Sequence, residues 1–238
     1  MTRLSRRRFI AMSAATLAAG RAFAAGREVA YWRGQALGAR AEIALCGISQ
    51  AEAAPLFDDL KLELSRVESL FSLYRTDSAL AQLNRDQVLL NPDPAMLHLL
   101  SEARAVFTAT EGAFDPTVQP LFDLHARAFA EGRRVGADEV QHVRRQVGFQ
   151  HVSLSPQAIR FQRSGMALTL NGIAQGYATD SLASLLKSAG LRDILVNAGE
   201  IRALGDGQGQ GWRVSIPGGR AFTLKDHAIA TSDVSGTL

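Results

Sequence analysis

One stretch of this sequence changes its apolar spacing abruptly, and the change predicts a strand that turns into a helix. Apolar side chains alternate along 166–171, as in a half-buried strand. They then recur at helical spacing up to Gly190. Gly172 and Gly176, near the join, would let a ligand approach the backbone, and a helix start offers unpaired N–H groups. The segment 170–180 is therefore a candidate phosphate-binding turn, with an ordinary tight connection as the alternative.

The glycine spacing in 170–180 does not identify a nucleotide site without further evidence. It lacks the Gly-Lys-Ser/Thr ending of a Walker loop, and it does not read Gly-x-Gly-x-x-Gly. The class of protein must therefore be inferred from the rest of the chain.

The N-terminal residues have the features of an export signal. Arg6, Arg7 and Arg8 precede an apolar run over 11–19, and Ala22-Phe23-Ala24 matches a small-x-small cleavage site. The run is shorter than the roughly 20 residues that span a bilayer. We expect a twin-arginine signal peptide over 1–24 and a periplasmic mature protein, with a retained N-terminal anchor as the alternative.

Removal of residues 1–24 changes the charge balance. The sequence has 26 basic and 23 acidic residues, and five arginines but no acid lie before residue 25, so the mature chain carries a net charge of −2. This balance gives no reason to expect nucleic-acid binding. Cys46 is the only cysteine, which excludes an internal disulfide and predicts a small core residue.

The remaining residues, 25–238, predict one α+β domain, a mostly antiparallel sheet packed with helices. Consecutive strands separated by short turns favour antiparallel pairing. Strands are expected over 27–32, 39–46, 151–155, 158–162, 166–170, 193–197, 200–204 and 212–216. Helices are expected over 49–71, over 94–110 with Asp93 as its cap, over 138–147 and over 174–189, with a short helix capped by Asp77 or Ser78.

Four separated motifs together resemble one known family. They are Phe71–Asn84, with an aromatic residue before a capped helix, the proline-rich turn Gly112–Leu121, the segment 170–180, and Val196–Ile201, a strand that breaks at a glycine. Their order and spacing resemble the FAD:protein FMN transferases, the ApbE-type flavin transferases of bacterial periplasms. The resemblance runs from about Leu37 to Leu238.

The resemblance implies a set of FAD contacts. Leu37 stands where the family often has a methionine near the flavin, and Tyr74 matches a flavin-contacting tyrosine. Ala113, Phe114 and Asp115 match a segment that holds FAD partly through backbone groups. An aromatic face can stack on a flavin ring, and a carboxylate can accept a hydrogen bond from its N–H edge. The alternatives are core packing for Tyr74 and a turn-forming Asp-Pro step for Asp115.

At the strand-to-helix motif the sequence departs from the family pattern. Thr169 stands where an acidic residue is common, and Asn171 replaces a glycine. The resemblance implies that the Gly172 carbonyl binds Mg²⁺ and that Gln175 is a polar contact of FAD. A carbonyl oxygen suits a hard cation of this kind.

The implied reaction is phosphoryl transfer, with FAD as a substrate. A threonine hydroxyl of an acceptor protein attacks the FMN phosphate, and AMP leaves, with Mg²⁺ neutralising the pyrophosphate charge. The implied acceptors belong to membrane-associated electron-transfer systems. The sequence assigns no catalytic residue: His227 is better explained as a polar residue entering a strand.

The resemblance further implies metal ligands that would follow Leu238, so we expect a domain that is incomplete at its C-terminus. We accordingly expect little or no FMN transfer by this chain alone. Two other functions remain open, a periplasmic FAD-binding protein without transferase activity and an FAD pyrophosphatase that uses water as the acceptor.

Overall fold

The computed structural model describes residues 28–207, 209–216 and 220–230. The expected signal peptide lies outside this range. By its internal contacts the chain divides into two compact units. Of the described residues, the first unit contains 28–66 and those between 175 and 230, and the second contains Val67–Ala174. This division is finer than the single domain expected from the sequence, whose outer bounds, 25–238, stay a prediction.

The first unit is built on a five-stranded antiparallel sheet. Its strands are β1 (Val29–Ala36), β2 (Ala39–Cys46), β6 (Ile194–Asn197), β7 (Ile201–Leu204) and β10 (Ala228–Ile229), in that spatial order. Short turns join β1 to β2 and β6 to β7, where Ala36 pairs with Ala39 and Asn197 with Ile201. The expected antiparallel pairing is confirmed, and His227 directly precedes β10.

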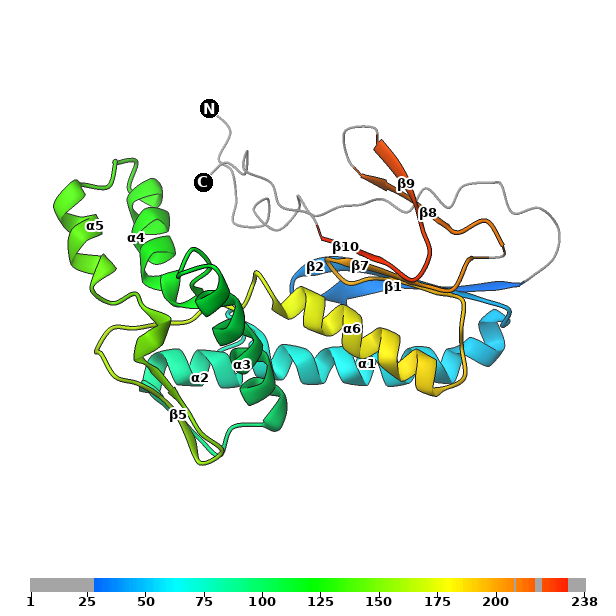
Figure 1. Ribbon diagram of the computed structural model, residues 1–238, viewed down its shortest axis with the longest axis horizontal. Coiled ribbons are helices and arrows are strands. Elements are labelled where there is room, and N and C mark those ends of the chain that lie inside the picture. The colour runs from blue at the N-terminus through cyan, green and yellow to red at the C-terminus, as the bar shows by residue number, and fades with distance from the viewer. Residues whose placement is uncertain (1–27, 208, 217–219, 231–238) are drawn as a thin grey trace. The chain divides into compact units, whose positions relative to one another are not determined.

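Two helices supply the apolar cover for one face of this sheet. They are α1 (Gln50–Phe71), whose last turn belongs to the second unit, and α6 (Ala174–Ser188), both drawn below the sheet in Figure 1. Ile43 and Leu45 of β2 share a buried cluster with Phe57, Leu60 and Leu64 of α1 and Leu182 and Leu186 of α6. This burial follows from the apolar stripe of α1, which repeats at the helical period.

The opposite face of the sheet carries a second cluster. The hairpin of β8 (Trp212–Ile216) and β9 (Arg220–Leu224) packs Trp212, Val214 and Leu224 against residues that include Ala44 and Leu195. Alternate residues of β2 thus reach opposite clusters, as the two-residue period of a strand requires. Cys46 lies in this second cluster and is buried, in agreement with the expected core role.

The second unit has a smaller antiparallel sheet and several helices. Its strands are β3 (Val88–Leu90), β5 (Ala158–Phe161) and β4 (Val152–Leu154), in that order. The helices are α2 (Ala79–Asp86), α3 (Pro94–Ala109), α4 (Gln119–Ala130) and α5 (Ala137–Arg144), with 3₁₀ turns η2 (Pro116–Val118) and η3 (Phe149–His151). The rings of Phe107 and Phe149 meet edge to face, with centroids 6.0 Å apart.

Most predicted elements are confirmed, including the α3 cap, where Asp93 Oδ1 accepts from Ala95 N. Of the two proposed α2 caps, Ser78 is the one that accepts, from Ala81 N. The expected proline-rich turn, 112–121, overlaps the start of helix α4, and the rest of this helix was not predicted. Pro120 instead lies in the first turn of the helix, where a missing N–H costs little.

The strand predicted over 166–170 is wrong. The segment has the alternating burial of a strand, since Met166, Leu168 and Leu170 are at most 1% exposed, but it pairs with no neighbouring strand in the described chain. Side chains supply its partners: the Asn84 amide bonds both backbone groups of Leu168. Along 28–207, 209–216 and 220–230, the structure has no helix that is long and apolar enough to cross a membrane.

Candidate functional site

Two of the motifs lie against each other in the second unit. Thr169 N donates to the carbonyl of Pro116 at 2.8 Å. A Cβ built on Gly172 would meet Phe114 Cε2 at 3.8 Å, an ordinary contact distance. The turn at 113–116 and the turn at 169–172 are therefore neighbours, although they are far apart in the sequence.

The Asp115 carboxylate shapes the first of these turns. Its Oδ1 accepts from both the N–H and the hydroxyl of Thr117, at 2.8 and 2.6 Å, and its Oδ2 accepts from Phe149 N at 3.2 Å. Thr117 is fully buried, and its hydroxyl oxygen accepts from Gly148 N at 2.7 Å. The Asp-Pro step is thus a structural feature of the turn, and an FAD contact by Asp115 would use the remaining acceptor capacity of its oxygens.

The same turn presents Ala113 and Phe114 differently. Ala113 is exposed, and the Phe114 side chain is half-buried. Phe114 N donates to Thr110 Oγ1 at 3.1 Å, which ties this residue to the end of α3.

The second turn, 169–172, contributes uncharged oxygen atoms of the kind that coordinate metal ions. Thr169 Oγ1 accepts from Asn171 N at 3.3 Å, and Asn171 and Gly172 are both exposed. Helix α6 begins directly afterward, with Ala174 N donating to Leu170 O at 2.7 Å. In the described part of the chain, no three His, Cys, Asp or Glu side chains gather where they could hold a metal ion. Mg²⁺ is usually bound through one or two carboxylates together with substrate phosphates, and the Thr169–Gly172 turn itself contributes only neutral oxygens.

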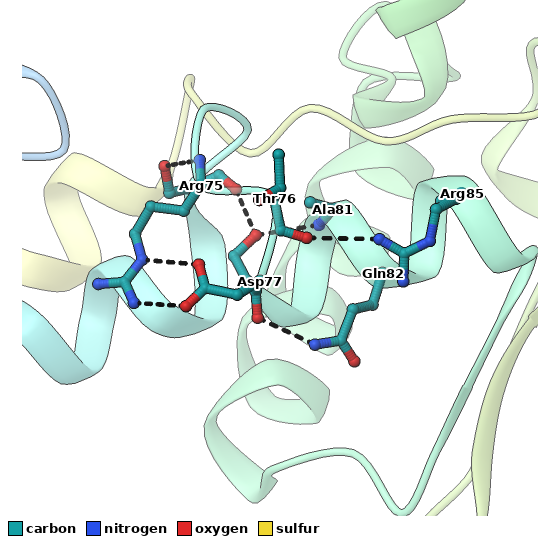
Figure 2. A network of polar contacts seen from close by, with 8 residues as sticks. Arg75, Thr76, Asp77, Ala81, Gln82 and Arg85 are labelled. Carbon is teal, nitrogen blue, oxygen red and sulfur yellow. Dashed lines mark hydrogen bonds and ion pairs between the residues drawn. The ribbon is translucent and has the colours of Figure 1, made fainter.

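Tyr74 is 63% exposed, which excludes the core-packing alternative. Ser72 fixes the backbone of its loop, because the Ser72 hydroxyl oxygen accepts from Tyr74 N at 3.1 Å and Arg75 N at 3.2 Å. Figure 2 shows this loop and the short helix α2 that follows it. An exposed aromatic ring on a fixed backbone is the arrangement that a stacking contact requires.

Gln175 contacts the fourth motif within the first unit. A Cβ built on Gly199 would lie 2.5 Å from Gln175 Cδ, and Gly199 has φ +103°, which favours glycine. In the same region Thr179 Oγ1 donates to Glu200 O at 3.2 Å, and Arg202 pairs with Asp180 at 2.8 Å. The start of α6 and the β6–β7 turn are therefore neighbours, joined by polar contacts.

Leu37 occupies the two-residue turn between β1 and β2. Its φ is +48°, and that of Gly38 is +81°, so both residues have the positive φ of a type I′ hairpin turn. A leucine is rare in this conformation, where Asn or Gly is preferred. A strained residue at a position with an expected ligand contact is consistent with a functional constraint.

The site residues expected from the sequence thus divide between the units. Leu37 and Gln175 belong to the first, and Tyr74, Ala113–Asp115, Thr169 and Gly172 to the second. Sequence reasoning missed the supporting residues Ser72 and Asn84. Asn84 ends the first motif, but its partner, Leu168, lies 84 residues further along the chain, and no local pattern reveals such a pairing.

A polar cluster also links α1 to α6 in the first unit. Arg66 bonds both oxygens of Glu63, at 2.8 and 2.9 Å, and reaches the Tyr177 hydroxyl at 3.4 Å. Ser181 donates to Glu63 as well. The hydrogen bonds from Arg66 and then Ser181 lower the pKa of Glu63, while partial burial opposes the shift. Glu63 is therefore ionised at neutral pH and acts as a structural acceptor.

Comparison with known proteins now identifies the class. The profile of the ApbE family matches residues 37–235, and the chain belongs to this family. It is similar to two curated proteins named FAD:protein FMN transferase. The Escherichia coli (strain K12) protein is 28% identical over 222 residues, which are 88% of this chain and 62% of the relative. The Vibrio cholerae protein is 30% identical over 201 residues, 76% of this chain and 59% of the relative. The chain thus spans about three-fifths of the length of these relatives.

Solved structures confirm the fold. A flavin transferase ApbE from Vibrio cholerae aligns with a TM-score of 0.75 and 26% identity, covering 87% of this chain and 72% of that one. The ApbE protein of Thermotoga maritima gives a TM-score of 0.74 and 25% identity, covering 88% and 74%. The expected α+β fold with antiparallel sheets and the expected family are therefore both correct.

Proposed function

We propose that this chain binds FAD and belongs to a flavin transferase. The transferase moves FMN from FAD to a threonine of an acceptor protein and releases AMP. Family membership supports the proposal. The observation that carries it is the contact between the 113–116 and 169–172 turns in one unit. Two motifs expected to bind one ligand are adjacent there, and the exposed ring of Tyr74 belongs to the same unit.

In the proposed reaction the threonine oxygen forms a bond to the phosphorus of the FMN half, and the bond from that phosphorus to the AMP oxygen breaks. Tyr74 would stack on the flavin ring, and backbone groups at Ala113–Asp115 would hold the dinucleotide. Leu37, Thr169 and Gln175 would supply the remaining contacts. No residue is assigned as the base that takes the hydroxyl proton. Placement of the two reactants is the main contribution expected of such residues.

Mg²⁺ is part of the proposal, with the Gly172 carbonyl as one ligand. When bound, the ion would neutralise charge on the pyrophosphate. Neutral oxygens of the Thr169–Gly172 turn have the right chemistry for a hard cation, and this turn itself contains no carboxylate.

The cellular setting is also a proposal. We infer that residues 1–24 direct export by the twin-arginine route and that 25–238 act in the periplasm. The acceptor would belong to a membrane-associated electron-transfer system. Replacing Arg7 and Arg8 with lysine in a fusion of 1–24 to a reporter should block its export, and unchanged export would contradict this route.

The function is tested by incubating the chain with FAD, Mg²⁺ and a candidate acceptor protein, followed by intact-mass measurement of the acceptor and chromatography of the nucleotides. An FMN adduct on a threonine together with free AMP supports the transferase and contradicts the expectation that this chain alone transfers little or no FMN. FMN and AMP without an adduct indicate a pyrophosphatase. Bound but unchanged FAD is the result expected if this chain alone binds FAD without transferring FMN.

Matched variants show whether the proposed site is responsible. Tyr74→Ala should weaken FAD binding, while Phe129→Ala, which removes another exposed aromatic side chain of the same unit, should leave it unchanged. Equal effects of both variants would contradict the assignment of Tyr74.

A further inference from the structure

The loop that carries Tyr74 is fixed by two buried serines. Ser72 Oγ accepts from the N–H groups of Tyr74 and Arg75, and Ser78 Oγ donates to the carbonyl of Ser72 at 2.5 Å. Ser78 is fully buried, and Ser72 is 9% exposed. Ser78 also accepts from Ala81 N at 3.0 Å, so one hydroxyl closes the loop and caps α2. The loop backbone is therefore fixed while the Tyr74 ring stays exposed.

Side chains of α2 brace the outer part of the same loop. Gln82 Nε2 donates to Asp77 O at 2.9 Å, and Arg85 Nη1 donates to Thr76 O at 3.4 Å. Arg75 forms two bonds to the Asp77 carboxylate, at 3.1 and 2.8 Å. Figure 2 shows these contacts following one another along the loop. An exposed loop with so many internal bonds loses little further backbone entropy when a ligand binds.

The C-terminal end of α2 forms hydrogen bonds with the backbone just before the second candidate turn, 169–172. Asn84 Nδ2 donates to Leu168 O at 2.9 Å, and Leu168 N donates back to Asn84 Oδ1 at 2.8 Å. Gln87 Nε2 donates to Met166 O at 3.0 Å. Leu168 directly precedes the Thr169–Gly172 turn, so α2 connects the Tyr74 loop at its start with the Gly172 turn at its end.

We propose that Ser72, Ser78 and Asn84 are positioning residues for FAD, which act by holding the Tyr74 ring and the Gly172 turn in place before the dinucleotide binds. The inference rests on the proposed function, because it assumes that both elements contact FAD. The two serines position the flavin end of FAD by fixing the loop that carries Tyr74. Asn84 positions the phosphate end of FAD by fixing the backbone of Leu168, just before the Gly172 turn. None of the three needs to touch the ligand.

The test uses fluorescence titration with two probes, FAD and riboflavin, because riboflavin has the ring but no phosphates. Ser72→Ala removes the acceptor for Tyr74 N and keeps the Ser78 cap. It should weaken the binding of both probes about tenfold, since a Tyr74 ring that is not fixed beforehand must be ordered on binding. It should also reduce the quenching of flavin fluorescence at saturation. Asn84→Ala should weaken the binding of FAD by a similar factor and the binding of riboflavin much less. Ser72→Thr retains a hydroxyl oxygen and should restore most of the quenching.

Asp93→Ala is the matched control. It removes a helix cap of the same kind in the same unit, at the start of α3, and so reports the effect of lost stability alone. Failure of the unaltered chain to bind FAD would refute the proposed function. If the unaltered chain binds FAD and Tyr74→Ala weakens binding, but Ser72→Ala and Asn84→Ala behave like Asp93→Ala, the proposed function survives and the positioning role is wrong.

Discussion

Two buried segments, β6 and 166–170, have their backbone hydrogen bonds satisfied in different ways. Strand β6 lies inside a sheet, where Leu195 is paired with Ala44 of β2 on one side and with Ala203 of β7 on the other. Segment 166–170 is held by the side chains of Asn84 and Gln87 and by one carbonyl, that of Pro116. The backbone hydrogen bonds of Met166, Leu168 and Thr169 thus each depend on one particular residue outside the segment. A single substitution should therefore affect it far more than β6.

The largest effect is expected from Asn84→Ala. The variant leaves the N–H and C=O of Leu168, a fully buried residue, without their partner. The free energy of unfolding should fall by about 3 kcal/mol, because two buried backbone groups lose their hydrogen bonds. Urea denaturation measures this change. Gln119→Ala, which removes an amide whose one partner among the described residues is the Asp123 side chain, should have little effect, and a similar loss in both variants would contradict the comparison.

This contrast also explains which parts of the fold the sequence could predict. The pairing of β1, β2, β6 and β7 follows from alternation and short turns, because backbone ladders need only the strand pattern and a tight connection. The 166–170 segment has the same pattern but an amide partner, so the pattern predicted the wrong element. Periodicity reports which side chains are buried, and it does not report what bonds the backbone.

The candidate site shows the same division. The resemblance to the family predicts Tyr74, Gly172 and Gln175 as site residues from the order of the motifs, and these assignments stay predictions. The support by Ser72 and Asn84 could not be read from the sequence, because it depends on contacts that only the folded chain forms. The Ser78 cap was predictable because a cap is a local feature.

Gly199→Ala tests the turn at the end of β6 and should have the second largest effect. The positive φ of Gly199 is unfavourable for alanine, so we expect a loss of about 1–2 kcal/mol in stability. The new Cβ would also displace the Gln175 side chain, which should weaken FAD binding if Gln175 is a contact. Thermal unfolding and FAD titration measure the two effects separately.

Two further variants check this explanation. Adding Gln175→Ala to Gly199→Ala removes the clash but not the backbone strain, so the stability of the double variant should stay low. Gly176→Ala is the control, since a Cβ there meets nothing within 4 Å. A loss of stability in Gly176→Ala equal to that in Gly199→Ala would show that strain is not the cause.

Leu37→Asn should change stability in the opposite direction. Asparagine tolerates the positive φ of this turn position better than leucine, so the β1–β2 hairpin should gain about 0.5–1 kcal/mol, a typical gain from relieving a strained turn. If Leu37 is retained for FAD, the same variant should bind FAD more weakly. A gain in melting temperature with unchanged FAD affinity would separate the strain from the proposed contact.

The smallest effect is expected where apolar packing holds the helices, at Glu63 between α1 and α6. Its folded-state pKa lies below the ordinary value of 4.5 because of the hydrogen bonds from Arg66 and then Ser181. The ionised form therefore adds stability that is fully present above pH 4.5 and is lost as the pH falls through the lowered pKa. Glu63→Gln should cost about 0.5–1 kcal/mol at pH 7, since the arginine partner is 41% exposed, and less at pH 3. Denaturation of both proteins at the two pH values measures the difference, with Asp58→Asn, in an exposed pair, as the control. An equal cost at both pH values would show that Glu63 contributes through packing, as the neighbouring apolar cluster does, and not through its charge.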